Sequence, residues 1–283
     1  MPSLPMSNLN NSMSQTYDRE NRGIPRLFAR HLVSLVSRHI HSPTTRIHDN
    51  ACGPAVFTSE LLKSLHSDHP GSAAAACPRI TATDISAEMI AATTDFLKDN
   101  NHITENVDAR VIDSTNLAGL REEVFDISVT NFGIWLTGKP HEALCEVVRT
   151  LKPGGVAVMT AWKWHGWLDL MGRISRVVRP GVEVRGVLAN RFLDEEGVMD
   201  ALVNAGFEAG RIEVEERTEM LMWDGEEDLR ALMCEGDFAR FAMKDWEASE
   251  RDAVPDAIEQ ALTDQEKLQS ALAKTAWVIT AGK

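Results

Sequence analysis

Hydrophobic positions along the chain follow two different spacings. In some segments apolar residues recur every three or four positions, which predicts amphipathic helices, and between these segments lie short apolar or alternating runs, which predict strands. We predict strands at 45–50, 79–84, 107–113, 125–132, 156–162, 211–221 and 275–281. We predict helices at 26–41, 54–65, 86–100, 140–151, 193–205, 226–246 and 254–273, and an irregular stretch at 163–192.

Strands that alternate with helices predict an α/β fold with a doubly wound sheet. The segment 125–132 is apolar on nearly every position, which is typical of strands covered on both faces in parallel sheets. Two helical segments separate the last two predicted strands, so we expect the final strand to lie antiparallel at the edge, beside its predecessor. The sequence therefore predicts a seven-stranded, mostly parallel, Rossmann-like sheet.

The chain divides into a short leader and one large domain. Residues 1–16 are rich in Ser, Asn and Pro and lack the apolar run of a secretory signal, so we expect a flexible leader. No apolar run reaches the roughly 18 residues that span a bilayer. We expect a single domain at 17–283, with its core at 45–162 and substrate-side insertions at about 163–192 and 224–273.

The negative net charge of the chain restricts the classes of binding partner that we expect. The net charge is −13, the isoelectric point is near 5.2, and no run of Lys and Arg exceeds two residues. Such a surface disfavours nucleic acid and anionic membranes, so we expect a small-molecule substrate. The four cysteines form no CxxC pair, which gives no indication of a metal site and favours a reducing, cytoplasmic location. The oligomeric state is not predicted.

The turn after the first predicted strand is the first candidate site. In a doubly wound sheet a nucleotide-like ligand lies against this turn. Asn50, Ala51, Gly53 and Ala55 are small or polar, which allows close approach of a ligand, and the following helix offers free N–H groups to an anion. Read alone, the segment fits a plain tight turn equally well.

Polar residues also end the next three predicted strands. Asp84 comes 31 residues after Gly53 and is placed to accept hydrogen bonds from ribose hydroxyls, although a helix cap is the alternative. Asp113 and Ser114 end the third strand, where an adenine amine would lie, and Asn131 ends the fourth. Because the carboxyl ends of parallel strands meet at one edge, we expect these residues to lie close together.

These residues, in this order, resemble the class I S-adenosylmethionine-dependent methyltransferases. Residues 49–53 are similar to the family's first motif, and Asp84 is similar to its ribose-binding acid, with Ile85 beside the adenine. Residues 113–114, 125–126 and the LKPGG string at 151–155 are similar to its later motifs. The resemblance covers about 45–162. It implies S-adenosyl-L-methionine as cofactor, bound by Tyr17, Asn50, Ala51, Gly53, Asp84, Ile85, Asp113, Ser114 and Asn131.

The sequence of the first motif, Asp-Asn-Ala-Cys-Gly, is similar to that of fungal secondary-metabolite methyltransferases. Within that group, the gliotoxin thiomethyltransferase type is the nearest that we can name. In that group an N-terminal aromatic and basic segment closes over the cofactor. The resemblance therefore implies a helical N-terminal lid that includes Tyr17, Arg22 and Arg26.

The acceptor side is expected after the fifth strand. S-adenosylmethionine carries a good electrophile, so the protein chiefly holds the nucleophile in line, and a base is needed only when that nucleophile must lose a proton. His165 is our candidate base, with a structural histidine as the alternative. Our candidate substrate contacts are Trp135, Trp162, Trp164 and Trp167, and a satellite core is the alternative for the tryptophans.

Two other functions stay open at this point. A protein of this fold can bind the cofactor and catalyse a reaction other than methylation, such as a cyclisation, or it can serve as a non-catalytic partner. The sequence predicts methyl transfer to an O, S or N atom of a small acceptor, and it does not identify that acceptor.

Overall fold

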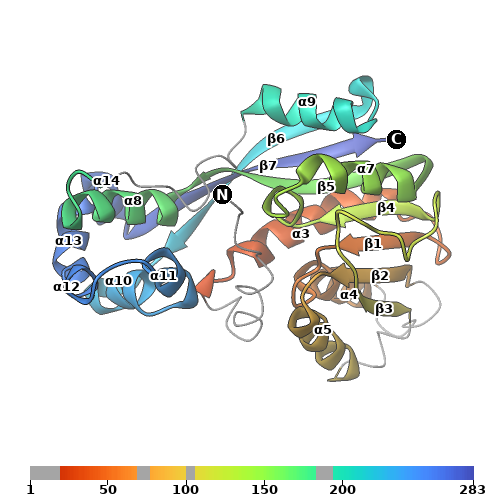
Figure 1. The fold of residues 1–283 in the computed structure, drawn as a ribbon. Coiled ribbons are helices and arrows are strands. Elements are labelled where there is room, and N and C mark those ends of the chain that lie inside the picture. Colours follow the sequence, from red (N-terminus) through yellow and green to blue (C-terminus); the bar gives the residue numbers. More distant parts are fainter. Residues whose placement is uncertain (1–19, 69–76, 100–105, 183–193) are drawn as a thin grey trace.

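A seven-stranded sheet forms the centre of the computed structural model, which describes residues 20–68, 77–99, 106–182 and 194–283 (Figure 1). The strands are β1 (Arg46–Asn50), β2 (Arg79–Asp84), β3 (Val107–Val111), β4 (Phe125–Thr130), β5 (Leu151–His165), β6 (Ile212–Met222) and β7 (Ala271–Gly282). Their order is β3-β2-β1-β4-β5-β7-β6. Strands β1 to β5 are parallel, and β7 runs antiparallel to both β5 and β6. The predicted α/β class is confirmed.

We had expected the last strand at the edge of the sheet, and this prediction was wrong. Strand β7 is antiparallel and lies beside β6, but it is inserted between β6 and β5. Nearly every residue of β7 is buried, whereas β6 exposes a row of glutamates. A strand that is apolar on both faces belongs inside a sheet, and a charged strand is suited to the edge, where it discourages pairing with other chains.

Helices cover both faces of the sheet. One face carries α3 (Ile24–Val36) and α4 (Val56–Asp68), and the other carries α7 (Pro140–Thr150) and α9 (Glu195–Ala205); α5 (Ala87–Asp99) follows β2. The core on the α3 side includes Phe28, Leu32, Ile47, Val158 and Val278, and the core on the α7 side includes Leu144, Val147, Leu202, Trp277 and Ile279. Ser86 caps the start of α5, because its hydroxyl accepts the Met89 N–H at 3.2 Å.

Six further helices form a helical cap beyond the ends of β5, β6 and β7 (Figure 1). They are α8 (Gly166–Val178), α10 (Gly225–Cys234), α11 (Asp237–Ala242), α12 (Ala248–Asp252), α13 (Val254–Ala261) and α14 (Asp264–Gln269). The prediction that 163–192 is irregular was wrong for its first half: 163–165 extend β5 and 166–178 form a helix whose buried residues recur at helical spacing. The two long helices predicted at 226–246 and 254–273 are instead four short ones, interrupted by Gly236 and by the Thr263 capping box, and α12 lies between the two predicted ranges.

The described helices are all too short or too polar to cross a bilayer. The LKPGG string begins β5, at the end of the strand opposite to the cap. There the Lys152 ammonium lies 2.6 Å from Asp126, and Gly154 and Gly155 exchange backbone hydrogen bonds with Lys283. This motif therefore fixes the start of β5 and lies away from the carboxyl edge of the sheet.

Candidate active site

The carboxyl ends of the parallel strands face the helical cap. Strand β5 runs parallel to β4 and leads directly into α8 of the cap, so β1, β2 and β4 end on the same side (Figure 1). This is the edge at which doubly wound sheets bind ligands. The predicted cofactor residues of the described chain therefore share one edge; Tyr17 lies outside the described residues.

The loop after β1 has an unusual backbone. Ala51, Gly53 and Ala55 have φ values of 52°, 54° and 59°, all in the left-handed region. This region costs a residue other than glycine roughly 1–2 kcal/mol. A Cβ built on Gly53 would meet no atom within 4 Å. The loop thus keeps the path of a glycine-rich turn and leaves open space in front of Gly53, where a ligand can approach the backbone.

Gly133 makes room for this loop. A Cβ at Gly133 would lie 2.3 Å from the Cβ of Ala51, so the two positions cannot both carry a methyl group without a shift of the backbone. Phe132, which precedes it, has a left-handed φ of 67°. The end of β4 and the loop after β1 are therefore fitted to each other.

Asp84 joins the first two strand ends. Its carboxylate accepts the Gly53 N–H at 2.9 Å through one oxygen and the Ser86 N–H at 2.9 Å through the other. A carboxylate accepts about four hydrogen bonds, so Asp84 can still accept a hydroxyl group. Burial raises the pKa of Asp84, and the backbone hydrogen bonds from Ser86, Gly53 and Ile85 act against that rise. The neighbouring Ile85 is 48% exposed, which leaves an apolar surface beside the carboxylate.

Asn50 and Ser114 are fixed by each other. The Ser114 hydroxyl donates to the Asn50 carbonyl oxygen at 2.9 Å, and the Asn50 amide reaches Thr130 at 3.4 Å, with Asn50 fully buried. Asp113 accepts both the N–H and the hydroxyl of Thr115 through one oxygen. Within the described residues, the second oxygen of Asp113 has no hydrogen bond and is available to a ligand.

Asn131 ties the N-terminal helix to the sheet. Its amide donates to the Pro25 carbonyl at 2.9 Å, and its own carbonyl accepts the Thr160 hydroxyl at 3.2 Å. Thr160 in turn accepts the Phe132 N–H at 2.9 Å. The side chain that we predicted as a cofactor contact is thus committed to holding α3 against β4 and β5.

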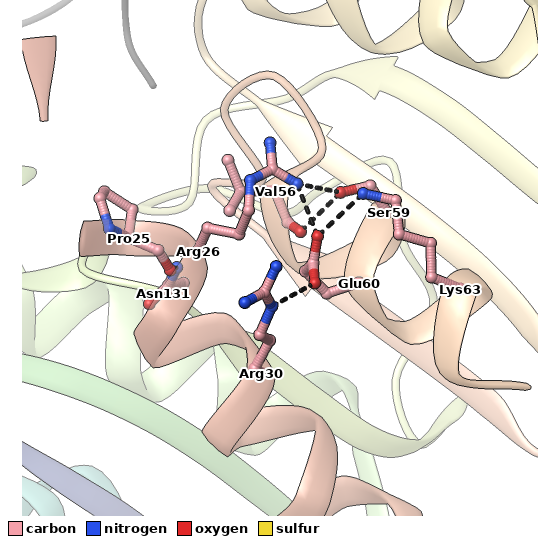
Figure 2. A network of polar contacts seen from close by, with 8 residues as sticks. All are labelled: Pro25, Arg26, Arg30, Val56, Ser59, Glu60, Lys63 and Asn131. Carbon is pink, nitrogen blue, oxygen red and sulfur yellow. Dashed lines mark hydrogen bonds and ion pairs between the residues drawn. The ribbon is translucent and has the colours of Figure 1, made fainter. Parts of the chain in front are cut away.

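A charged network holds α3 against α4 (Figure 2). Glu60 is 6% exposed and accepts hydrogen bonds from Arg26 at 2.6 Å, Arg30 at 2.8 Å and Lys63 at 3.0 Å. Burial alone would raise the pKa of Glu60, but the hydrogen bonds from Arg30, Arg26 and Lys63 lower it to about 2. The carboxylate is therefore ionised at neutral pH, and α3 is fixed beside the helix that begins at the candidate loop.

The start of α3 also contacts the cap. The Arg22 guanidinium forms two hydrogen bonds of 2.7 Å with the Asp228 carboxylate of α10, and Glu20 accepts the Asp237 N–H at the start of α11. The hydrogen bonds from Arg22 lower the pKa of Asp228. Arg22 thus connects the N-terminal segment to α10 of the cap, and Arg26 connects it to α4.

An aromatic layer lies where β4 and β5 leave the sheet. The rings of Phe132 and Trp162 are stacked, with centroids 3.8 Å apart and planes at 9°, and Phe28 of α3 meets both edge-on. Trp162 also meets His165 edge-on at 5.0 Å. Offset and edge-to-face pairs of this kind stabilise a rigid apolar surface.

A bulge in β5 brings His165 to this layer. The pairing with β7 shifts between Trp162 and Trp164, so that Trp162 pairs with Ala276 and His165 pairs with Lys274. Side chains alternate along a regular strand, and residues 162 and 165 would lie on opposite faces without the extra residue. The bulge therefore places His165 and Trp162 on the same face as Lys274.

Lys274 is buried in this region. The side chain is 2% exposed, and its ammonium nitrogen lies over the Trp162 ring at 5.6 Å from the centroid. Burial lowers the pKa of Lys274 to about 7. Burial, and then the charge of Lys274, hold the pKa of His165 well below its usual range.

Comparison with known proteins identifies the fold. Residues 49–159 match the family described as methyltransferase domain. Two fungal proteins are each 24% identical to the chain. Methyltransferase ucsB of an Acremonium species matches over 135 residues, which are 48% of this chain and 46% of that protein. Methyltransferase tpcH of Aspergillus fumigatus matches over 193 residues, which are 68% of this chain and 56% of that protein. Residues 49–159 are thus similar to a methyltransferase domain. The chain spans about half the length of these curated relatives.

Solved structures share the fold of this chain. A putative methyltransferase from Bacillus halodurans has a TM-score of 0.57 at 14% identity, and covers 89% of this chain and 98% of its own. The [4+2]-cyclase SpnF has a TM-score of 0.51 at 18% identity, and covers 89% of this chain and 80% of its own. The fold is thus shared by proteins described as catalysing different reactions.

The fold brings together most of the residues singled out in the sequence. The described cofactor candidates lie on one edge, and Trp162 and His165 lie at its end. Trp164 is 46% exposed, and Trp167 donates its indole N–H to Leu232 of the cap at 3.1 Å. Trp135 is buried with the core on the α7 side. These three tryptophans are therefore not placed beside Trp162.

Sequence reasoning missed three features of the structure. Lys274 was overlooked although it is a lone lysine in an apolar strand, which is a readable signal. Glu60 is a single acid within an amphipathic helix, and its cationic partners on α3 have no local signature. The fit between Gly133 and Ala51 joins residues 82 positions apart, and nothing in either segment alone indicates it.

Proposed function

We propose that the chain transfers a methyl group from S-adenosylmethionine to an O, S or N atom of a small-molecule acceptor, as in fungal secondary metabolism. One observation carries this proposal: the left-handed loop after β1 and the Asp84 carboxylate are joined by a hydrogen bond at the edge of a methyltransferase domain. The gliotoxin-type subgroup, the flexible leader and the cytoplasmic location belong to the same proposal.

The residues present fit this cofactor. Open space in front of Gly53 suits close approach of its amino acid part, the free lone pairs of Asp84 suit the ribose hydroxyls, and exposed Ile85 suits one face of the adenine. The unused oxygen of Asp113 suits the adenine amine. Bound there, the cofactor would supply an electrophilic methyl group, and the work of the protein is to bind and orient the acceptor.

The other candidates take supporting roles in this proposal. Asn50, Ser114 and Ala51 shape the cofactor loop, and Asn131 holds α3 over it. Tyr17, together with Arg22 and Arg26, is proposed as part of the N-terminal lid. Trp162 is proposed to contact the acceptor, and His165 to accept a hydrogen bond from it, because burial keeps the imidazole neutral.

Calorimetric titration with S-adenosylmethionine and with its demethylated product tests the cofactor site. We expect both to bind the wild-type chain, and Asp84→Asn to weaken both at least about tenfold, because each hydrogen bond to a charged group contributes roughly 1.5–3 kcal/mol. Asp108→Asn is the matched control, since Asp108 is an exposed acid on β3 that pairs with Arg110. Equal affinity of wild type and Asp84→Asn would contradict the proposal.

Turnover separates methyl transfer from the alternatives. Because proteins of this fold include one described as a [4+2]-cyclase, cofactor binding does not by itself decide the reaction. We expect release of demethylated cofactor when phenols, thiols and amines are supplied as acceptors. Binding of the cofactor without its consumption by any acceptor class would favour a non-methylating or non-catalytic role.

A further inference from the structure

Lys274 and His165 lie together behind the aromatic layer. In the part of the chain that the structure describes, the Lys274 ammonium makes no hydrogen bond and no ion pair, and its one specific contact is the face of Trp162. Among the described residues, the Nδ1 atom of its strand neighbour His165 is buried and has no hydrogen-bond partner. Buried polar groups are nearly always satisfied, so this unsatisfied nitrogen beside a buried lysine indicates a place for a missing partner.

The charged side chains of the described residues around Lys274 are paired with other partners, so none of them serves as its counter-ion. Glu219 of β6 is its register partner, but Arg217 binds that carboxylate at 2.7 Å. On the neighbouring α8, Arg173 binds Glu266 of α14. His165 is neutral at physiological pH and lies on β5. A protonated Lys274 would therefore be stabilised by an anion that enters with a ligand.

The surroundings of this pair are aromatic and adjoin the cofactor edge. Trp162, over which Lys274 lies, stacks on Phe132, and Phe132 follows Asn131 at the end of β4. Gly133, the next residue, contacts the loop proposed to bind the cofactor. A planar acceptor stacked in this layer would thus have its polar group near Lys274 and lie next to the methyl donor.

We propose that the acceptor is a phenol and that the amine of Lys274 takes its hydroxyl proton, with His165 as a second hydrogen-bonding partner of the oxygen. This inference rests on the proposed methyl transfer and names its substrate class. Phenols ionise near pH ~10, so they need a base near neutral pH, whereas carboxylic acids are already ionised. A neutral amine in an apolar site can accept that proton because the resulting ammonium pairs with the phenolate.

The proposed reaction balances as a proton transfer followed by a displacement. The phenol O–H bond breaks and its proton forms the fourth bond of the Lys274 nitrogen, which leaves the electron pair on oxygen. The phenolate oxygen then forms a bond to the methyl carbon, and the carbon–sulfur bond breaks with its electrons remaining on sulfur. The products are an aryl methyl ether, the demethylated cofactor and an ammonium that returns its proton to solvent.

The ionisation of a bound phenol tests this without any turnover. The probe is 4-nitrophenol, whose anion absorbs visible light, titrated with pH in the presence of the full-length chain. We expect the wild-type chain to bind the anion and to lower the apparent pKa of the probe by about one unit or more, as an adjacent cation does. We expect Lys274→Met, and also Lys274→Gln, to lose that shift and to weaken binding at least about tenfold.

Lys163→Met is the matched control, because Lys163 lies on β5 over the Trp277 ring at 4.3 Å and is half-exposed. It should bind the anion as the wild type does. The proposal is overturned if the wild-type chain binds only neutral 4-nitrophenol, or if both Lys274 variants still bind its anion with wild-type affinity. Since the probe needs no cofactor, these results are independent of whether S-adenosylmethionine binds.

Discussion

Replacement of Lys274 by methionine should stabilise the fold while it removes the proposed base. Methionine has a similar length and no charge, so the substitution leaves the space next to Trp162 filled. The pKa of Lys274 falls from 10.5 to about 7 on folding because the side chain is buried. A difference of this size means that folding disfavours the protonated amine by roughly 5 kcal/mol.

The pH dependence follows from the direction of this change. Folding releases a proton from Lys274 between the two pKa values, so the penalty is complete below about pH 7, shrinks as the pH rises, and is absent above about 10.5. Lys274→Met should therefore gain about 2–5 kcal/mol of unfolding free energy near pH 7, and progressively less toward pH 10.

Urea unfolding at several pH values measures this gain. For Lys274→Met we expect a higher urea concentration at the unfolding midpoint and an unchanged dependence of the unfolding free energy on urea. For Lys163→Met we expect a change within about 1 kcal/mol, because the partly exposed Lys163 ammonium pairs with exposed Glu216. A less stable Lys274→Met variant near pH 7, or a gain that does not depend on pH, would refute the reasoning. A residue that is costly to folding and required for binding is the usual mark of a functional group.

Three further substitutions test the candidate edge. Glu60→Gln should lower the unfolding free energy by roughly 1–3 kcal/mol at neutral pH, an effect lost as the pH falls from 4.5 toward about 2, and acid-dependent urea unfolding measures it. Gly133→Ala should destabilise by about 2 kcal/mol or more, and Ala51→Gly should restore much of the loss, which a double-mutant cycle by thermal unfolding detects. Asn131→Ala should cost about 1–2 kcal/mol and increase hydrogen exchange at the start of α3; unchanged exchange would contradict its role in holding that helix.

The position of the cofactor edge was predictable because local patterns encode where strands end. Asp84 directly closes an apolar strand, and the small residues around Gly53 directly follow another. Their convergence then follows from parallel topology alone. What the sequence does not contain is the bond between them: the Gly53 N–H and the Asp84 carboxylate are brought together by packing of two strands, and no local pattern specifies a 2.9 Å contact.

The acceptor side of the site was less predictable because it depends on how β5 and β7 pair and on which face of the sheet each side chain lies. The final strand was expected at an edge and to begin at 275, which left Lys274 between that strand and the helix predicted at 254–273. In the structure β7 lies inside the sheet, and Lys274 is therefore buried. Similarly, the three tryptophans that end or follow the fifth predicted strand were predicted to have the same role, and the bulge in β5 distinguishes Trp162 from Trp164 by sending them to different surroundings.

Two sets of departures from ordinary local structure lie at the carboxyl edge of the sheet. Left-handed Ala51 and Ala55 belong to the loop after β1, and the unsatisfied Nδ1 atom of His165, on β5, lies beside buried Lys274 of β7. Strain and unsatisfied groups persist where surrounding structure holds them for a purpose. The two sets are linked through Phe132, since its successor Gly133 contacts the loop and its ring stacks on Trp162. If one set binds the methyl donor and the other its acceptor, methyl transfer must take place beside the Phe132 ring.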